Sequence, residues 1–393
     1  MIQRGCSVQL SRLARSVRES ATMAGSSAPI PHPHPINLAI GQPAEGPARV
    51  VIEAVVKAAR DGQTRYGPPA GLPALRALAA RDQFEKTGIT RAVKEVIITP
   101  GGKPALLDAL RCMLDPGDEV LVLAPYWPSF LQQVELAGGR ARIVPPGPGL
   151  LPDPDTIAAA CTERTRVIIL NDPCNPTSRT LGASLLRRIG EVAHQRGLWI
   201  LADQVYADLV LDGDHVPLLA VAPELAEHTV VVESFSKRFA MTGYRVGYAC
   251  GPAPVIGAMT RLATASTTCV NSLAQHAAIA ALSMDDTWIR AQRARYRRRR
   301  DRAWALLESL GCAPACLPDT AFYLFFPVPP GAEDDAIVRD LRLNEGLTVL
   351  SGSDFGAPGH IRLSCGASDA ELDEAGLRLR RFLGAATVFD APR

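Results

Sequence analysis

The segment SFSKRFAMTGYR holds a lysine, Lys237, and an arginine, Arg245, on either side of a glycine turn. Lys237 follows the apolar run TVVVE at 229–233, where a buried strand is expected to end. Only five of the chain's 42 basic residues are lysines, so a lysine at this place indicates a chemical role that arginine cannot fill. An amine can lose its proton and attack a carbonyl, which a guanidinium cannot readily do. Lys237 therefore predicts imine chemistry.

An acid closes a second apolar run, LWILA at 198–202. Asp203 comes directly after this run, and Tyr206 follows one helical step later. A carboxylate at the end of a buried strand needs a partner because its charge is costly to bury. A salt-bridged structural acid and a functional acid fit these residues equally well.

Small residues follow a third apolar run, EVIIT at 95–99. Gly101, Gly102 and Lys103 open an expected helix, whose free backbone amides and dipole can hold a phosphate group. Turns also use glycine for other purposes, so an ordinary turn fits the same residues.

Two further turns carry groups that can bind a planar ring. Trp127 follows the apolar run at 118–124, where its aromatic face can stack on a ligand. Asn175 lies in the turn after the run at 166–170, and its amide can bind a phenolic oxygen or a carboxylate. Core packing of the tryptophan and a plain Asx-Pro turn are the alternatives.

The five apolar runs alternate with helical stretches, which predicts a parallel α/β sheet. The polar residues described above all follow strands, at the carboxyl edge where open α/β sheets bind ligands. After residue 298 the order changes to a long helix, a strand at 321–326, a helix at 333–345 and strands near 347–351 and 360–364. This order predicts a smaller α/β domain.

Composition narrows the classes of function. At 393 residues the chain is long enough for two packed lobes, and 47% apolar with 21% charged residues is ordinary for a globular protein. A net charge of +2 gives no field that would attract nucleic acid or an anionic membrane. No apolar run reaches the ~18 residues that span a bilayer. We therefore expect a small-molecule partner.

Several segments resemble other kinds of site, and for each we favour a structural role. The arginine-rich run at 290–302 has helical apolar spacing, which indicates a solvated helix face. Cys312 and Cys316 lack a second ligand pair, and His32 and His34 alternate with prolines in a spacer, so we expect no metal site. The nine cysteines form an odd set without CxxC pairs, which indicates a reducing, cytoplasmic setting.

Taken together and in order, GGKPAL, PYW, NDPCNPT, ADQVY and SFSKRFAMTGYRVGYACG resemble the class I aminotransferases of fold type I. Within that family the chain is most similar to the bacterial aspartate aminotransferases, which share the GGK turn, the PYW motif and an arginine-rich YRRRRD helix. The resemblance covers roughly residues 37–385. It implies an α/β fold whose large domain has a mostly parallel seven-stranded sheet, with a smaller α/β domain built from both chain ends.

The resemblance also implies domain limits and a cofactor. We expect an N-terminal arm at 1–36, a large domain at 37–298 that binds pyridoxal 5′-phosphate, and a small domain at 299–393 that packs with residues 37–45. The cofactor would form a Schiff base with Lys237. Asp203 would keep the cofactor's ring nitrogen protonated, so that the ring acts as an electron sink.

The same comparison assigns the groups around the cofactor ring. Tyr206 and Asn175 would hydrogen-bond the ring hydroxyl oxygen and lower the pKa of the imine, while Trp127 would stack on the ring.

At the other end of the cofactor, the comparison assigns a phosphate site. The phosphate would rest on the amides of Gly102 and Lys103, with Ser234 and Arg245 adding a hydroxyl and a cation. Tyr66 would reach it from the partner subunit, which implies a homodimer with shared active sites.

For the substrate, the resemblance implies an amino acid and a 2-oxo acid that react in a ping-pong cycle. Arg362 would grip the α-carboxylate, helped by Asn175 and the backbone at Gly41, with Trp127 also beside the substrate. Lys103 would face the side-chain carboxylate of aspartate or glutamate, and the alternative is that it merely supports the phosphate.

The chain departs from the family pattern at a few positions. Gln204 replaces a glutamate and Ser178 a glycine, and neither change removes a catalytic group. Thr320, also at a glycine position, and the prolines Pro104 and Pro128 are expected to reshape the substrate pocket. The alternative function is therefore a specialised biosynthetic lyase, cyclase or oxidase that uses the same cofactor on a free amino acid.

Overall fold

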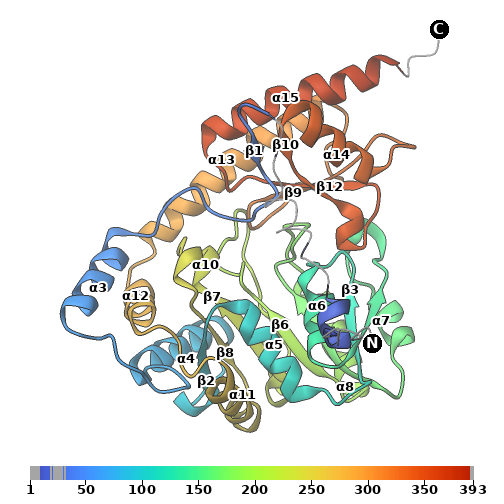
Figure 1. Ribbon diagram of the computed structural model, residues 1–393. Coiled ribbons are helices and arrows are strands. Elements are labelled where there is room, and N and C mark those ends of the chain that lie inside the picture. Colours follow the sequence, from blue (N-terminus) through green and yellow to red (C-terminus); the bar gives the residue numbers. More distant parts are fainter. Residues whose placement is uncertain (1–8, 18–19, 21–29, 31, 390–393) are drawn as a thin grey trace, which may run out of the picture.

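The computed structural model describes residues 9–17, 20, 30 and 32–389, and it has a large sheet and a small one covered by helices (Figure 1). The large sheet has seven strands in the order β2-β8-β7-β6-β5-β3-β4, and only β8 runs antiparallel to its neighbours. Its strands are β2 (Val96–Thr99), β3 (Glu119–Leu123), β4 (Arg140–Val144), β5 (Thr165–Asn171), β6 (Trp199–Asp203), β7 (Thr229–Ser234) and β8 (Gly247–Cys250). The predicted mostly parallel α/β fold is confirmed.

Both faces of this sheet are buried, which explains why most of its strands are continuous apolar runs. In β5, Val167 and Ile169 enter one core, and Ile168 and Leu170 enter the core on the opposite face. The first core also contains side chains of α5 (Gly102–Met113), α6 (Ser129–Leu136) and α11 (Ala253–Ser266). The second contains side chains of α7 (Pro154–Ala160), α8 (Ala183–Gln195) and α9 (Leu218–Val221).

A third core lies at the edge formed by β2 and β8. It includes Val96 and Tyr248 from these strands. The helices that pack there are α3 (Arg49–Arg60), α4 (Pro73–Thr87) and α12 (Ser272–Leu282). Among the described residues, α1 (Arg12–Ser16) is the first helix.

The small sheet is antiparallel, in the order β11-β12-β9, and consists of β9 (Tyr323–Pro327), β11 (Leu350–Ser351) and β12 (His360–Ser364). Beside it, β1 (Ile36–Asn37) pairs in parallel with β10 (Leu347–Thr348), so an early segment joins the C-terminal part of the chain. Helices α13 (Thr287–Ser309), α14 (Asp334–Glu345) and α15 (Asp369–Phe389) complete this part (Figure 1). The predicted boundary at residue 298 falls inside α13, and we keep the two-domain division as a proposal.

The arginine-rich run forms part of α13; Arg290, Arg297, Arg298 and Arg302 are exposed, but the prediction of a solvated face is wrong for two arginines near its end. Arg299 and Arg300 are only 4% and 3% exposed. Arg299 pairs with Glu45 at 2.7 Å and with Asp369 at 3.1 Å, and Arg300 pairs with Asp212 and with Asp301. Acids from separate segments face the helix, so these arginines tie α13 to the rest of the protein.

Within the described ranges, no helix has the length and apolar character needed to cross a membrane. The same part of the chain holds no group of three or more His, Cys, Asp or Glu side chains placed to bind a metal ion. The eight cysteines that lie in it are all free.

Candidate active site

A cavity of about 560 Å³ lies at the carboxyl edge of the large sheet, where the predicted polar side chains gather. Strands β6 and β7 end at it with Asp203 and Ser234, and β12 contributes Arg362 from the small sheet. The predicted site residues that line it are Gly41, Gly102, Lys103, Trp127, Asn175, Asp203, Tyr206, Ser234, Lys237, Arg245 and Arg362. Segments from nearly the whole chain therefore meet at one site.

Asp203 is a buried acid that faces this cavity. The residue is 3% exposed, and one carboxylate oxygen accepts a hydrogen bond from the backbone N–H of Val205 at 3.3 Å. Burial raises the pKa of Asp203 to about 7. In the described part of the chain no cation forms an ion pair with this carboxylate. Of the two interpretations of the sequence, the structural salt bridge is therefore wrong, and the site can place a positive ligand group here.

Lys237 lies on the short helix α10 (Phe235–Arg238), directly after β7. Burial lowers the pKa of its amine to about 7, with the positive charges of Arg362, Arg245 and Lys103 acting in the same direction. The amine donates a hydrogen bond to the carbonyl oxygen of Gly41. A lysine with such a pKa is about half neutral at pH 7 and largely neutral a unit above it, and the neutral amine is the nucleophilic form.

A buried ion-pair network holds the segment around Lys237. Arg238 donates to Asp82 on α4 at 2.6 Å, and the hydroxyl of Tyr248 donates to the other oxygen of Asp82 at 2.6 Å. Lys86, also on α4, donates to Glu233 on β7 at 2.7 Å. The network ties α10 to α4, β7 and β8, so the helix that carries Lys237 is held by three other elements.

Glycines leave room for an anion at the start of α5. A Cβ on Gly101 would lie 2.7 Å from Nη2 of Arg245, and a Cβ on Gly247 would lie 3.0 Å from the carbonyl carbon of Gly101. Ser234 adds a buried hydroxyl, and Arg245 donates to the carbonyl oxygen of Thr242 at 2.9 Å. Free amides at a helix N-terminus beside a guanidinium are groups that can hold a phosphate.

Arg362 on β12 also lines the cavity and is 1% exposed. Its Nη1 donates to Oδ1 of Asn175 at 2.8 Å, and its Nη2 donates to the carbonyl oxygen of Ala39. The guanidinium carbon lies 4.4 Å from the ring centroid of Tyr323 and 4.9 Å from that of Phe355. Two aromatic rings thus restrain the cation, while its Nε has no hydrogen-bond partner among the described residues.

Tyr323 also lines the cavity, although the sequence did not predict it as a site residue. Its hydroxyl lies 2.7 Å from the hydroxyl of Tyr206, and burial raises the pKa of both phenols. The sequence signal that could have identified Tyr323 was the TAFY turn at 320–323, of which only Thr320 had been considered. Other residues that line the cavity without having been predicted are Ile40, Gln42, Leu106, Asn171, Val205, Ser236 and Thr242.

Lys103 lies at the exposed rim, with its ammonium 4.8 Å from the ring centroid of Trp127. Partial burial and the charge of Arg245 lower the pKa of Lys103. Among the described residues, four basic side chains line the cavity, against the single acid Asp203. This imbalance favours a ligand with several anionic groups.

Some predicted residues lie elsewhere. The side chain of Tyr66 is 88% exposed and does not line the cavity of its own chain. The departures from the family pattern, Gln204, Ser178, Thr320, Pro104 and Pro128, do not line it either. The reshaping of the pocket by Thr320 and the two prolines therefore stays a prediction, and any such effect must pass through neighbouring residues that do line the cavity.

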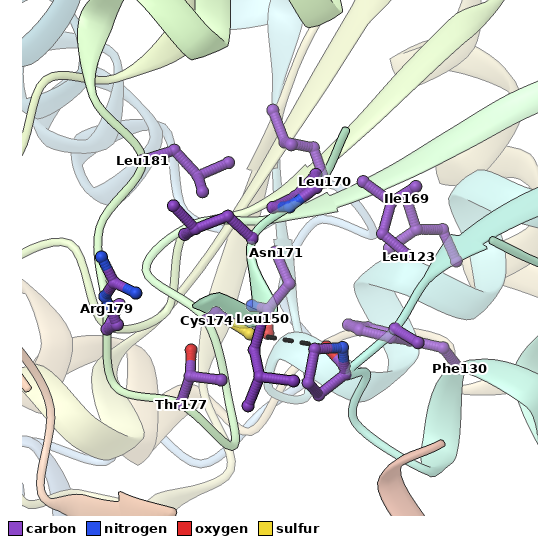
Figure 2. A pocket seen from close by; sticks show the side chains of 14 residues that line it. Leu123, Phe130, Leu150, Ile169, Leu170, Asn171, Cys174, Thr177, Arg179 and Leu181 are labelled. Carbon is purple, nitrogen blue, oxygen red and sulfur yellow. Dashed lines mark hydrogen bonds between the residues drawn. The ribbon is translucent and has the colours of Figure 1, made fainter. Parts of the chain in front are cut away.

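A much smaller void, of about 30 Å³, lies behind the turn that carries Asn175 (Figure 2). Cys174 points into this region and donates a weak hydrogen bond to the carbonyl oxygen of Pro125 at 3.6 Å (Figure 2). Burial raises the pKa of the Cys174 thiol, which makes it a poor nucleophile. The void has room for a water or two rather than for a substrate.

The donor set fits pyridoxal 5′-phosphate. Asp203 offers an unpaired carboxylate for a protonated ring nitrogen, Lys237 an amine for the aldehyde, and the start of α5 an anion site. Each of these groups faces the same cavity.

Comparison with known proteins gives a consistent result. The family model for aminotransferases of class I and II matches residues 33–379. An aspartate/prephenate aminotransferase of Thermus thermophilus is 37% identical over 386 residues, which cover 96% of this chain and 99% of that protein. An aspartate aminotransferase of Geobacillus stearothermophilus is 36% identical and covers 89% of this chain and 91% of its own length.

Solved structures that are similar to this chain are also aminotransferases. An aspartate aminotransferase of Thermus thermophilus with maleate superposes with a TM-score of 0.90 at 36% identity, covering 96% of this chain and all of that one. An aromatic aminotransferase of Pyrococcus horikoshii gives a TM-score of 0.86 at 31% identity, covering 90% and 97%.

Proposed function

The chain belongs to the class I and II aminotransferases and is a transaminase that depends on pyridoxal 5′-phosphate, and from this premise we propose that its amino donor is an acidic amino acid, aspartate or glutamate. The observation that carries the proposal is that an exposed lysine, Lys103, and a buried arginine, Arg362, line the same cavity. Two such cations suit a substrate with two carboxylates.

When bound, the cofactor supplies an electrophilic carbon for the donor's amine and a ring that takes up the electron pair of the Cα–H bond. In our proposal Asp203 holds the protonated ring nitrogen, and the start of α5 with Arg245 holds the phosphate. Lys237 would hold the cofactor through its Nζ. Once a donor had taken its place, the neutral Nζ would accept the α-proton of the donor and would be the acid that gives it back.

Substrate orientation rests on Arg362. Its guanidinium is fully buried and restrained by Asn175 and by two aromatic rings, so little freedom is lost when it binds the α-carboxylate. Trp127 would cover the cofactor ring beside the substrate, and the hydroxyl of Tyr206 would donate to the cofactor's ring oxygen. A 2-oxo acid binding to the same groups completes the ping-pong cycle.

Family likeness alone leaves the donor's side chain open, since the similar solved structures include both aspartate and aromatic aminotransferases. The discriminating assay compares kcat/KM for aspartate, alanine and phenylalanine in the parent and in Lys103→Met. We expect aspartate to be the best donor and the variant to lose roughly tenfold to a hundredfold on aspartate alone, as is common for a lost charge-assisted contact. Faster turnover of alanine than of aspartate by the parent would contradict the acidic donor.

The departures that suggested a lyase, cyclase or oxidase do not line the cavity directly, and this activity is kept as the alternative to be tested. Incubation with donor alone tests it. A transaminase converts about one equivalent of donor per site and then stops, because the cofactor keeps the amino group. Continued product formation would instead indicate the alternative.

We further propose that the protein acts as a homodimer with shared active sites. The 88% exposed Tyr66 and the exposed apolar side chains of Val50, Ile52 and Val56 on α3 suit a surface that a second copy covers. Light scattering measures the mass, and mixing Tyr66→Ala with Lys237→Ala tests the sharing. In a hybrid dimer of the two variants, one active site would carry both defects and the other neither, so activity should reappear. If each variant is inactive alone and the verified hybrid dimer is also inactive, the active sites are not shared between subunits.

For the cell compartment, we propose the cytoplasm. The free cysteines of the described residues suit a reducing setting. Fractionation of the source cells, followed by detection of the protein, tests this placement.

A further inference from the structure

Two of the departures from the family pattern meet each other in the fold. Ser178 ends the turn that carries Asn175, and Thr320 precedes β9. The backbone N–H of Thr320 donates to the carbonyl oxygen of Ser178 at 3.1 Å. The backbone N–H of Tyr323 donates to the hydroxyl oxygen of Ser178 at 3.0 Å. Both Ser178 and Thr320 are fully buried.

Thr320 is held from its other side as well. Its hydroxyl donates to the carbonyl oxygen of Leu209 at 3.0 Å, and the N–H of Ala321 donates to the same carbonyl at 2.8 Å. Leu209 follows Tyr206 by three residues and packs in the same core. The segment 320–323 is therefore bonded both to the turn that carries Asn175 and to the segment that carries Tyr206.

Ser178 occupies a backbone conformation that favours glycine. Its φ is +52°, in the left-handed region where a side chain is strained. The hydroxyl compensates by accepting the N–H of Tyr323, which would otherwise be a buried donor without this partner. The serine thus accepts backbone strain and gains a contact with β9.

Tyr323, the residue bonded in this way, contacts three groups of the proposed site. Its hydroxyl lies 2.7 Å from that of Tyr206, and its ring covers the guanidinium of Arg362 at 4.4 Å. A Cβ on Gly41 would lie only 1.7 Å from the Tyr323 hydroxyl, so the phenol also rests against the Gly41 backbone. A shift of Tyr323 would move all three contacts together.

We propose that Ser178 and Thr320 form a staple, defined by their bonds to Tyr323 and Leu209, that makes Tyr323 a positioning residue of the amino acid site. Tyr323 orients the hydroxyl of Tyr206 and the guanidinium of Arg362. The inference rests on the proposed roles of these two residues in transamination. It gives a role to Ser178 and Thr320, which stand where the family has glycine and which do not line the cavity.

The test variant is Ser178→Gly, because glycine accepts the left-handed backbone and removes the hydroxyl together with its Cβ without adding strain. In the protein without cofactor, hydrogen exchange of the peptide that spans 320–326 should become at least several-fold faster. In the holoenzyme, the KM for the best donor should rise about threefold to tenfold with kcat changed less than twofold. The pKa of the cofactor imine, read from its absorbance, should rise by several tenths, because Tyr206 becomes a poorer donor to the ring oxygen.

Controls separate the possible causes. Thr229→Ala removes an equally buried hydroxyl at the far end of β7, where Oγ1 donates to the carbonyl oxygen of Leu225 at 2.9 Å, and should leave KM and the imine pKa unchanged. Tyr323→Phe removes the phenol contact without touching the staple, so it should raise the imine pKa even if Ser178→Gly fails to fold.

The outcomes separate the proposed function from the staple. A parent protein that transaminates no amino acid would overturn the proposed function, and the exchange measurement would still report whether Ser178 holds Tyr323. If the parent is active and Ser178→Gly has the same hydrogen exchange, KM and imine pKa as the parent, the staple is refuted. A Tyr323→Phe variant whose KM and imine pKa match the parent would overturn the positioning role.

Discussion

Replacing Asp203 by asparagine should stabilise the protein without cofactor while disabling the holoenzyme. The carboxylate is buried at the end of β6 and no described cation pairs with it. Without the cofactor, the folded protein above neutral pH must therefore hold a desolvated charge. Asparagine has nearly the same shape and no charge, so the variant removes this cost.

The magnitude follows from the pKa of Asp203, which burial raises from 3.8 to about 7. Since a tenfold tighter binding of the proton corresponds to about 1.4 kcal/mol, the full effect is about 4 kcal/mol, as an upper bound. A folded-state pKa above the unfolded value means that the folded form binds the proton more tightly. The stabilisation from this proton is complete below about pH 4 and is lost as the pH rises through about 7.

The assay is the free energy of unfolding of the cofactor-free protein in urea, measured at about pH 4.5 and about pH 8, on either side of the pKa of Asp203. The advantage of Asp203→Asn over the parent should grow between these values by up to about 3 kcal/mol, because about 1 kcal/mol of the full effect is already lost at pH 4.5. Asp155→Asn, whose side chain is 89% exposed, is the matched control and should change little. An advantage that is absent at the higher pH, or equal at both pH values, would refute the reasoning.

Two further predictions concern Lys237 and its support. Because the pKa of Lys237 is lowered to about 7, the rate at which cofactor rejoins the stripped protein should rise with pH to half its maximum near pH 7, and a midpoint near 10 would rule out the desolvated amine. Asp82→Asn removes one of the two acids that Arg238 and Lys86 share, while Asp208 remains beside both cations, and should destabilise the protein by about 1.5 to 3 kcal/mol in thermal or urea unfolding. Arg49→Ala, which breaks an exposed pair with Glu53, should cost less than about 1 kcal/mol, and equal effects of the two variants would contradict the role of burial.

The parts of the fold that the sequence predicted are those with a strong local signal. Five strands of the large sheet are buried on both faces and read as apolar runs. The strand β4 was missed because it is an exposed edge strand with the sequence RARIV, and β8 because the short GYAC begins with glycine. Whether a strand lies at the edge of a sheet, and which strand it pairs with, depends on tertiary structure and cannot be read from local hydropathy.

The same limit explains the outcome at the site. Residues that end strands of the large sheet gathered at one edge, as the parallel topology requires. Tyr323 was missed because its place beside Tyr206, 117 residues away, depends on how β9 packs against the large sheet. The buried ion pairs of Arg299 were missed for a related reason, since their acids, Glu45 and Asp369, lie far away in the sequence.

The central claim is that Lys237 holds the cofactor, and the most direct test locates that covalent bond. Borohydride reduction of the holoenzyme fixes the imine, and mass spectrometry of its peptides then identifies the labelled lysine. We predict the label on Lys237, with Lys57, Lys86, Lys94 and Lys103 unmodified, and no fixed label in Lys237→Ala. A label on another lysine, or an unlabelled Lys237 in an active enzyme, would contradict this claim.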